Sequence, residues 1–281
     1  MSEVERRQIA VNGLHLSALM LDAGADCRQT LVLLHGFTGS AASWIDLLPG
    51  LLQPGRRLIA LDLPGHGYSD APAQPARYAI ERCSADICAA LLALGVGAQE
   101  AVLLGYSLGG RIALSIACAG FLRALILESA SPGISDPGER AQRRQSDHLL
   151  ARRIECVGVE AFVTEWERLP LFASQSNLPQ AVREALRAQR LRNRAPGLAN
   201  SLRGAGAGAQ QPLHAHLHRL ELPVLLLAGA HDEKYCRIAR EMAASLPRAR
   251  LEIVPDAGHA IHLEQPAGFT QLVNTFCHAV D

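Results

Sequence analysis

Eight short apolar runs recur along the chain, and each ends in small or turn-forming residues. Several, such as LVLL within 30–34 and VLLL within 224–228, are apolar at every position. That pattern is typical of a strand covered on both faces in a parallel sheet. We therefore predict eight β-strands, at 7–11, 17–21, 30–34, 57–61, 101–104, 124–127, 224–228 and 250–254.

Longer amphipathic stretches separate most of these strands and predict helices over 78–94, 108–118, 233–244 and 265–278. Alternating strands and helices favour an open, mostly parallel, doubly wound α/β sheet with helices on its faces. Only the turn Asn12–Gly13 joins the first two strands, so these should form an antiparallel hairpin at one edge.

The alternation stops between about Ser131 and Leu220, where helical stretches follow one another. Residues 140–203 hold 12 arginines and six acidic residues, a net charge of +6 in a chain whose net charge is zero. We predict an α/β core of residues 1–130 and 221–281, with a helical cap, residues 131–220, inserted after the sixth strand. Within the cap, GAGAGAQQ at 204–211 indicates a flexible connection.

Composition excludes several classes of protein. Lys+Arg and Asp+Glu are both 27, which excludes a globally basic nucleic-acid binder. The seven cysteines are irregularly spaced with no CxxC pair, which favours a reducing, cytoplasmic compartment over a disulfide framework. Neither a signal peptide nor a run of ~18 apolar residues is apparent, so we expect no membrane partner. We expect a monomer or a weak homo-oligomer.

The motif Gly105-Tyr106-Ser107-Leu108-Gly109-Gly110 follows a predicted strand and opens a predicted helix. This is the context of the G-x-S-x-G nucleophile elbow, in which a serine sits on a sharp, strained turn. Side chains at the glycine positions would collide with that turn. The serine also lies at a helix N-terminus, where partial positive charge favours a developing anion.

A serine nucleophile needs a base, and the base needs a carboxylate that orients it. Asp232 follows the strand at 224–228, and His259 follows the strand at 250–254, so serine, acid and histidine occur in the order found in α/β-hydrolases. His262 is the competing base and Glu128, at the end of the sixth strand, is the competing acid. Asp256 is expected to form a turn.

Two backbone amides are expected to form an oxyanion hole. One belongs to Leu108, directly after the serine, and the other to Phe37, in the loop after the third strand. His35 in that loop is expected to be buried and hydrogen-bonded. The loop 62–70 is expected to line the far wall of the crevice.

Other chemistry has weak support in the sequence. His214, His216 and His218 alternate, but no carboxylate or cysteine lies close by, so we predict no metal site. Neither a dinucleotide fingerprint nor a phosphate-binding loop is present, so we predict no cofactor.

Six segments together give a resemblance that runs along the whole chain: LLHGFTGSAASW, DLPGHGYSD, GYSLGGRIAL, ESASPG, AGAHDEKY and DAGHAIHLEQP. They are similar to proteins of the α/β-hydrolase fold. Adding ERAQRRQSD, EWERLPLF and LANSLRGAGAGAQ, the chain resembles the 2-succinyl-6-hydroxy-2,4-cyclohexadiene-1-carboxylate synthase (MenH) family.

The resemblance implies a carbon–oxygen lyase of menaquinone biosynthesis. Such an enzyme eliminates pyruvate from 2-succinyl-5-enolpyruvyl-6-hydroxy-3-cyclohexene-1-carboxylate, without a cofactor, to give 2-succinyl-6-hydroxy-2,4-cyclohexadiene-1-carboxylate. Its substrate carries three carboxylates, which guanidinium groups pair with bidentately. The motifs carry substrate-binding roles to Tyr106, Arg111, Arg143, Trp166 and Arg190. Arg144 is an alternative to Arg143, and Arg192 and Arg194 are alternatives to Arg190.

The resulting hypothesis is proton abstraction by Ser107, assisted by His259 and Asp232. The same three residues serve nucleophilic attack equally well. A hydrolase that cleaves an ester or a C–C bond of an acidic substrate therefore stays open as the alternative, as does a ligand-binding protein without catalysis.

Overall fold

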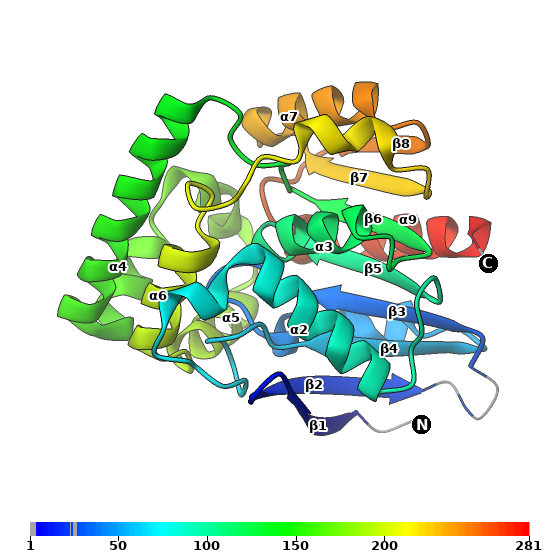
Figure 1. Cartoon of the computed structure of the whole chain (residues 1–281), viewed down its shortest axis with the longest axis horizontal. Helices are drawn as coiled ribbons and strands as arrows, with labels where there is room; N and C mark the ends of the chain where they lie inside the picture. The colour runs from blue at the N-terminus through cyan, green and yellow to red at the C-terminus, as the bar shows by residue number, and fades with distance from the viewer. Residues whose placement is uncertain (1–3, 23, 25–26, 281) are drawn as a thin grey trace.

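The computed structural model describes residues 4–22, 24 and 27–280, and its centre is one eight-stranded sheet (Figure 1). The strand order is β1-β2-β4-β3-β5-β6-β7-β8, and only the pairs β1–β2 and β2–β4 are antiparallel. All eight predicted strands are confirmed, with ends that differ by at most three residues. Their bounds are β1 Glu5–Val11, β2 Leu14–Asp22, β3 Gln29–Leu34, β4 Arg56–Leu61, β5 Ala101–Tyr106, β6 Ala124–Glu128, β7 Val224–Gly229 and β8 Ala249–Val254.

The predicted edge hairpin is also confirmed. Asn12 and Gly13 both have positive φ, 46° and 80°, as a tight two-residue turn between twisted antiparallel strands requires. In the centre of the sheet, Leu31–Leu34 and Val102–Leu104 are fully buried, which explains why their strands are apolar at every position.

Helices cover both faces of the sheet, so the core has three layers. On one face pack α2 (Ile80–Ala93), α3 (Leu108–Cys118) and α7 (Glu233–Ser245). On the other pack the 3₁₀ helix η1 (Ala41–Leu47), α1 (Leu48–Leu51) and α9 (Pro266–Ala279). The short helices η2 (Pro75–Tyr78) and α8 (Ile261–Glu264) lie in the connecting loops.

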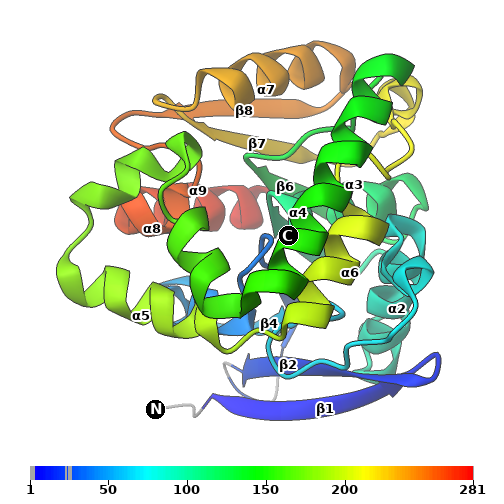
Figure 2. The same cartoon turned by 90° about the vertical axis from the view of Figure 1, so that its left-hand side faces the viewer.

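After β6 the chain leaves the sheet, and the described residues of 131–220 form helices and no strand. These are α4 (Pro137–Trp166), η3 (Pro170–Asn177), α5 (Gln180–Leu191), α6 (Ala195–Ala205) and η4 (His214–Arg219). The first four gather beyond the carboxyl ends of the parallel strands, with α4 and α6 side by side, whereas η4 packs against α7 (Figures 1 and 2). Ile154, Phe162 and Leu198 belong to a separate apolar cluster there. The division into core and cap by residue number stays a prediction.

The expectation of a flexible connection at 204–211 is wrong. Gly204 and Ala205 end α6, and the Gly208 amide donates to Asp147 Oδ2 at 3.3 Å. A Cβ on Gly208 would lie 2.2 Å from the Arg144 amide nitrogen, so the backbone packs directly against α4. The glycines therefore allow close packing between two backbones, which composition alone does not distinguish from a linker.

No helix in the described part of the chain is both long and apolar enough to span a bilayer. The 30-residue α4 is strongly charged, and it bends at Gly158, whose φ is 78°.

Replacing Gly208 with alanine should lower the free energy of unfolding by about 1–3 kcal/mol, because the new methyl group has no room beside α4. Denaturant unfolding monitored by circular dichroism measures this change. Gly268→Ala is the matched control, since a Cβ there meets no atom within 4 Å and alanine favours its helix. Equal stability of the Gly208→Ala variant and the native chain would contradict close packing at 204–211.

Candidate active site

Ser107 occupies a strained turn between β5 and α3. Its φ and ψ are 51° and −107°, a conformation that L-residues rarely adopt. A Cβ on Gly105 would lie 2.4 Å from the Gly109 carbonyl oxygen, and a Cβ on Gly109 would lie 2.4 Å from the Leu34 carbonyl oxygen. The two glycines thus let three backbone segments meet where the serine is presented.

The structure brings Ser107, His259 and Asp232 together into one hydrogen-bonded chain. His259 Nε2 lies 3.1 Å from Ser107 Oγ, and His259 Nδ1 lies 2.7 Å from Asp232 Oδ2. His259 and Asp232 are 2% and 8% exposed. Asp232 follows β7 and caps α7, and its Oδ1 accepts a hydrogen bond from the Tyr235 amide at 3.2 Å. A carboxylate in this position fixes the imidazole tautomer that leaves Nε2 free to accept the serine proton.

The competing base and acid pair with each other instead. His262 Nδ1 lies 2.9 Å from both carboxylate oxygens of Glu128, and Glu128 Oε1 also accepts a hydrogen bond from the His262 amide at 3.0 Å. This buried pair anchors α8 close behind His259. Asp256, expected in a turn, is exposed with a φ of 52°.

The Tyr106 ring lies between the two histidine–carboxylate pairs. Its centroid is 5.4 Å from that of His259 and 4.8 Å from that of His262. Burial, with the nearby Glu128 charge, raises the pKa of Tyr106 well above its usual value, so the phenol stays neutral.

A cavity of about 170 Å³ opens over Ser107 and includes the predicted residues Phe37, Tyr106, Leu108, Arg111, Arg143 and Trp166 in its lining. Arg111 Nη1 donates to Gln210 Oε1 at 3.0 Å, and Arg143 Nε donates to Asp147 Oδ1 at 2.8 Å. Burial lowers the pKa of Arg111 to about 10, which leaves it charged at neutral pH. The cavity therefore combines a serine hydroxyl with two guanidinium groups, and Lys234 adds a third cation to its lining.

Aromatic side chains form the cap-side wall of this cavity. The Trp166 ring lies 5.3 Å from Phe37 and 5.5 Å from Phe172, measured between centroids. Its indole Nε1 is buried and has no hydrogen-bond partner among the described residues.

Arg190, in contrast, is not brought to this cavity. Its guanidinium donates to Glu167 Oε1 and Gln175 Oε1, both at 3.2 Å, in a neighbouring pocket of the cap. Arg144 donates to the Gly208 carbonyl, and Arg194 to the Ser69 carbonyl. Neither these two residues nor Arg192 is among the described residues that line the cavity.

The loop 62–70 also contributes no described residue to the cavity lining, so that expectation is wrong. Its buried Asp62 instead accepts hydrogen bonds from the amides of Ala41 and Tyr68, at 2.6 and 3.0 Å, and so shapes two loops. Among the described residues there is also no group of three or more His, Cys, Asp or Glu that could hold a metal ion.

Comparison with known proteins agrees with this geometry. A family model described as the α/β hydrolase fold matches residues 29–266. The putative 2-succinyl-6-hydroxy-2,4-cyclohexadiene-1-carboxylate synthase of Bacillus subtilis is 44% identical over 92% of this chain and 94% of its own. The synthase of Serratia proteamaculans is 34% identical over 93% of this chain and 98% of its own. The chain belongs to this synthase family within the α/β-hydrolase fold.

A solved structure supports the same assignment. MenH from S. aureus superposes with a TM-score of 0.88 at 32% identity, covering 94% of this chain and 98% of that one. The α/β-hydrolase fold, the flanking helices and the helical insertion after β6 are thus shared with a synthase.

Sequence reasoning missed several residues that line the synthase cavity. Lys234 and Tyr235 reach it from the first turn of α7, and the Tyr235 ring lies 4.7 Å from His259. Their position two and three residues after Asp232 was a usable signal. Phe172 was not detectable in this way, because only the folding of η3 brings it to the cavity.

Two buried histidines support the loop that carries Phe37. The Leu63 amide donates to His35 Nε2 at 3.0 Å, and His35 Nδ1 donates to the Gly36 carbonyl at 2.8 Å, so this ring is neutral, as expected for a structural histidine. His66 packs 5.1 Å from His35. Burial lowers the pKa of His35 to about 4 and that of His66 to about 3.

These two histidines should make the synthase less stable as the pH falls from about 6.5 to about 4. The unfolded chain takes up protons in this range and the folded chain does not, so the free energy of unfolding falls, by about 3 kcal/mol at pH 4 for His35 alone. Urea unfolding between pH 7.5 and 4.5 measures this slope. His66→Gln should flatten it, whereas His278→Gln, on the exposed side of α9, should not. Identical slopes in all three proteins would show that buried neutral histidines are not its source.

Proposed function

We propose that this chain is a carbon–oxygen lyase that eliminates pyruvate from 2-succinyl-5-enolpyruvyl-6-hydroxy-3-cyclohexene-1-carboxylate. The product is 2-succinyl-6-hydroxy-2,4-cyclohexadiene-1-carboxylate, the compound in the names of its relatives. The observation that carries the proposal is the chain from Asp232 through His259 to Ser107, which ends in a cavity lined by arginines.

In this proposal Ser107 acts as a base. His259 accepts the serine proton, Asp232 stabilises the resulting imidazolium, and the serine oxygen removes a proton from the substrate ring. The electron pair of that C–H bond enters the ring π-system, and the ring carbon–oxygen bond to the enolpyruvyl group breaks. The pyruvate enolate that leaves takes up at carbon one proton, which balances the proton that the His259 imidazolium then gives up, so atoms and charge balance without a cofactor.

The negative charge that develops on the substrate during proton removal is stabilised by hydrogen-bond donors that are already in position. The backbone amides of Phe37 and Leu108, on either side of Ser107, are the proposed oxyanion hole, and preorganised donors of this kind contribute ~3–4 kcal/mol each.

Arg111 and Arg143 are the proposed partners of the substrate carboxylates. Gln210 holds Arg111 without neutralising it, so its charge is available to an anion. Arg143 is paired with Asp147 but is 45% exposed at its side chain, so a carboxylate can approach its free edge. The same cations would bind a neutral ester poorly, which favours a polycarboxylate substrate.

We also propose that the enzyme works in the cytoplasm as a monomer or weak homo-oligomer. It would act on a small molecule and need neither nucleic acid nor a membrane. The balanced charge and the seven free cysteines support this proposal.

Purified enzyme should release pyruvate from the enolpyruvyl precursor, measured by coupling to lactate dehydrogenase. Ser107→Ala should lower kcat roughly 10²–10⁴-fold through loss of the base. Arg143→Ala should mainly raise KM, because it removes a carboxylate partner. Ser146→Ala, an exposed serine on α4, is the matched control. Absence of pyruvate from the native enzyme would remove the lyase assignment and leave the fold intact.

Turnover should leave no covalent adduct on Ser107. Neither pyruvate nor the cyclohexadiene product should contain oxygen from water, apart from oxygen that ketone groups exchange with water without the enzyme. The reason is that a base takes only a proton, whereas a nucleophile forms a bond. Quenched-flow mass spectrometry in H₂¹⁸O checks both points, and an esterase of the same fold that forms an acyl-enzyme is the positive control. An acyl-serine at residue 107 would instead indicate the hydrolase alternative.

A further inference from the structure

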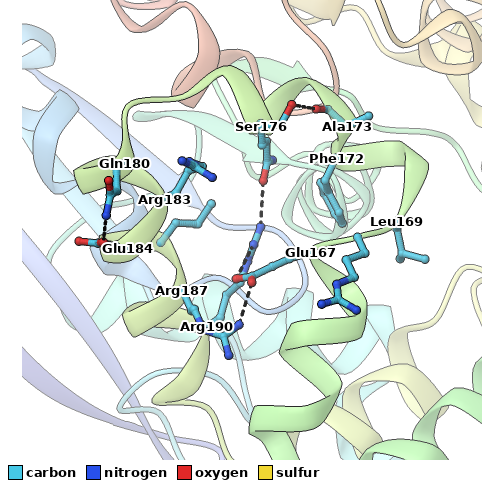
Figure 3. Close-up of a pocket in the computed structure, with 13 residues that line it drawn as sticks. Glu167, Leu169, Phe172, Ala173, Ser176, Gln180, Arg183, Glu184, Arg187 and Arg190 are labelled. Carbon is cyan, nitrogen blue, oxygen red and sulfur yellow. Dashed lines mark hydrogen bonds and ion pairs between the residues drawn. The ribbon is translucent and has the colours of Figure 1, made fainter.

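A second cavity, of about 690 Å³, lies entirely within the cap between η3 and α5 (Figure 3). Four arginines line it, Arg168, Arg183, Arg187 and Arg190, together with two acids, Glu167 and Glu184. Their formal charges give this outer pocket a net charge of +2. Neither Ser107 nor His259 is among the described residues that line it.

The Glu167 carboxylate forms ion pairs with two of the four arginines. Arg187 Nη1 lies 2.8 Å from Glu167 Oε2, and Arg190 Nη1 lies 3.2 Å from Glu167 Oε1, so both guanidinium groups converge on the same acid (Figure 3). Glu184 accepts a hydrogen bond from Gln180 Nε2 at 2.7 Å and pairs with no described arginine. The positive charge of the pocket is thus only partly neutralised by its own acids.

The guanidinium groups of Arg168 and Arg183 have no hydrogen bond or ion pair with any described residue. Both are exposed and line the pocket, one from the segment after α4 and the other from α5. Arg153, another exposed arginine of the cap, does find an acid, Glu165, at 2.6 Å. Two unpaired guanidinium groups facing one hollow form an anion-binding surface.

The wall of the outer pocket has a buried cation and an apolar part. Arg190 is only 6% exposed, and its guanidinium lies 5.5 Å from the Phe172 ring centroid. Leu169 and Leu186 line the same hollow. The combination suits an anion that carries several carboxylates on a hydrocarbon frame, rather than a small inorganic ion.

Phe172 connects this pocket to the catalytic cavity, because its side chain lines both. Its ring also lies 5.5 Å from Trp166 and 6.2 Å from His259, measured between centroids. Phe172 is therefore a residue that the two hollows share in their walls.

We infer that the outer pocket is a docking subsite for polycarboxylate anions, with Arg168 and Arg183 as its ligand-binding residues. It captures the substrate before the molecule passes Phe172 into the Ser107 cavity, and in this respect it rests on the proposed function. Exposed guanidinium groups bind a carboxylate weakly, which allows capture followed by release inward. Long-range attraction to the pocket raises the rate of encounter and falls with added salt.

Citrate is a tricarboxylate probe that tests the anion site without turnover. Calorimetric titration of the full chain at low salt should detect binding, and the double variant Arg168→Gln Arg183→Gln should weaken it roughly three- to tenfold. Arg219→Gln, an exposed arginine of η4 outside the pocket, is the matched control. An Arg111→Gln Arg143→Gln background removes both guanidinium groups of the Ser107 cavity and leaves only Lys234 as a cation there. Citrate binding to this background should persist, and it should still weaken when Arg168 and Arg183 are replaced.

Loss of citrate binding in the Arg111→Gln Arg143→Gln background, with insensitivity to the outer arginines, would overturn the inference. So would the absence of citrate binding to the native chain. The citrate titration needs no catalysis, so its result does not depend on the proposed function. If the enzyme releases no pyruvate, the proposed function is refuted, and the titration still decides whether the outer pocket binds anions.

The docking role has its own kinetic signature. The double variant should lower kcat/KM for pyruvate release roughly fivefold with kcat unchanged, and 0.5 M salt should abolish the difference from the native enzyme. Unchanged kcat/KM in a variant that has lost citrate binding would show that the pocket binds anions but plays no part in substrate capture.

Discussion

The close approach of three backbone segments around Ser107 is the constraint on which the rest of the site depends. The end of β5, the first turn of α3 and the carbonyl of Leu34 meet so tightly that neither Gly105 nor Gly109 has room for a Cβ. This packing holds the serine at a positive φ and points its hydroxyl out of the sheet edge. The surrounding fully buried strands resist relaxation of that turn, so the strain persists in the folded state.

Two histidine–carboxylate pairs lie below the cap, and they have different roles. His259 with Asp232 reaches the serine, whereas His262 with Glu128 is sealed in the core and holds α8. Both acids sit at the carboxyl ends of adjacent strands, β7 and β6, where parallel sheets place ligands and catalytic groups. Tyr106, neutral and partly buried between the rings, separates the pairs. One pair is thus free to take part in proton transfer while the other stabilises the structure around it.

The arginines of the cap differ in whether they pair with an acid or line a hollow that can bind an anion. Several of its arginines pair with acids, as in Arg203 with Glu155 at 2.6 Å and Arg143 with Asp147. Cap arginines line two hollows that share Phe172: Arg143 lines the one over Ser107, and Arg168 and Arg183, which have no acid partner, line the one between η3 and α5. Binding of anions therefore depends on a few arginines rather than on the total charge of the segment.

The sequence by itself determined the strands, the elbow and the order of serine, acid and histidine. Each of these is a local pattern: apolar runs, a glycine spacing, and polar residues directly after strands. It did not distinguish Gly204–Gln211 from a linker, because close packing and flexibility both favour glycine. It also placed Arg190 with the substrate-binding residues, whereas the structure pairs it with Glu167. Only tertiary structure decides which of several neighbouring arginines finds an acid, because ion pairs depend on residues distant in the chain and on ångström-scale geometry.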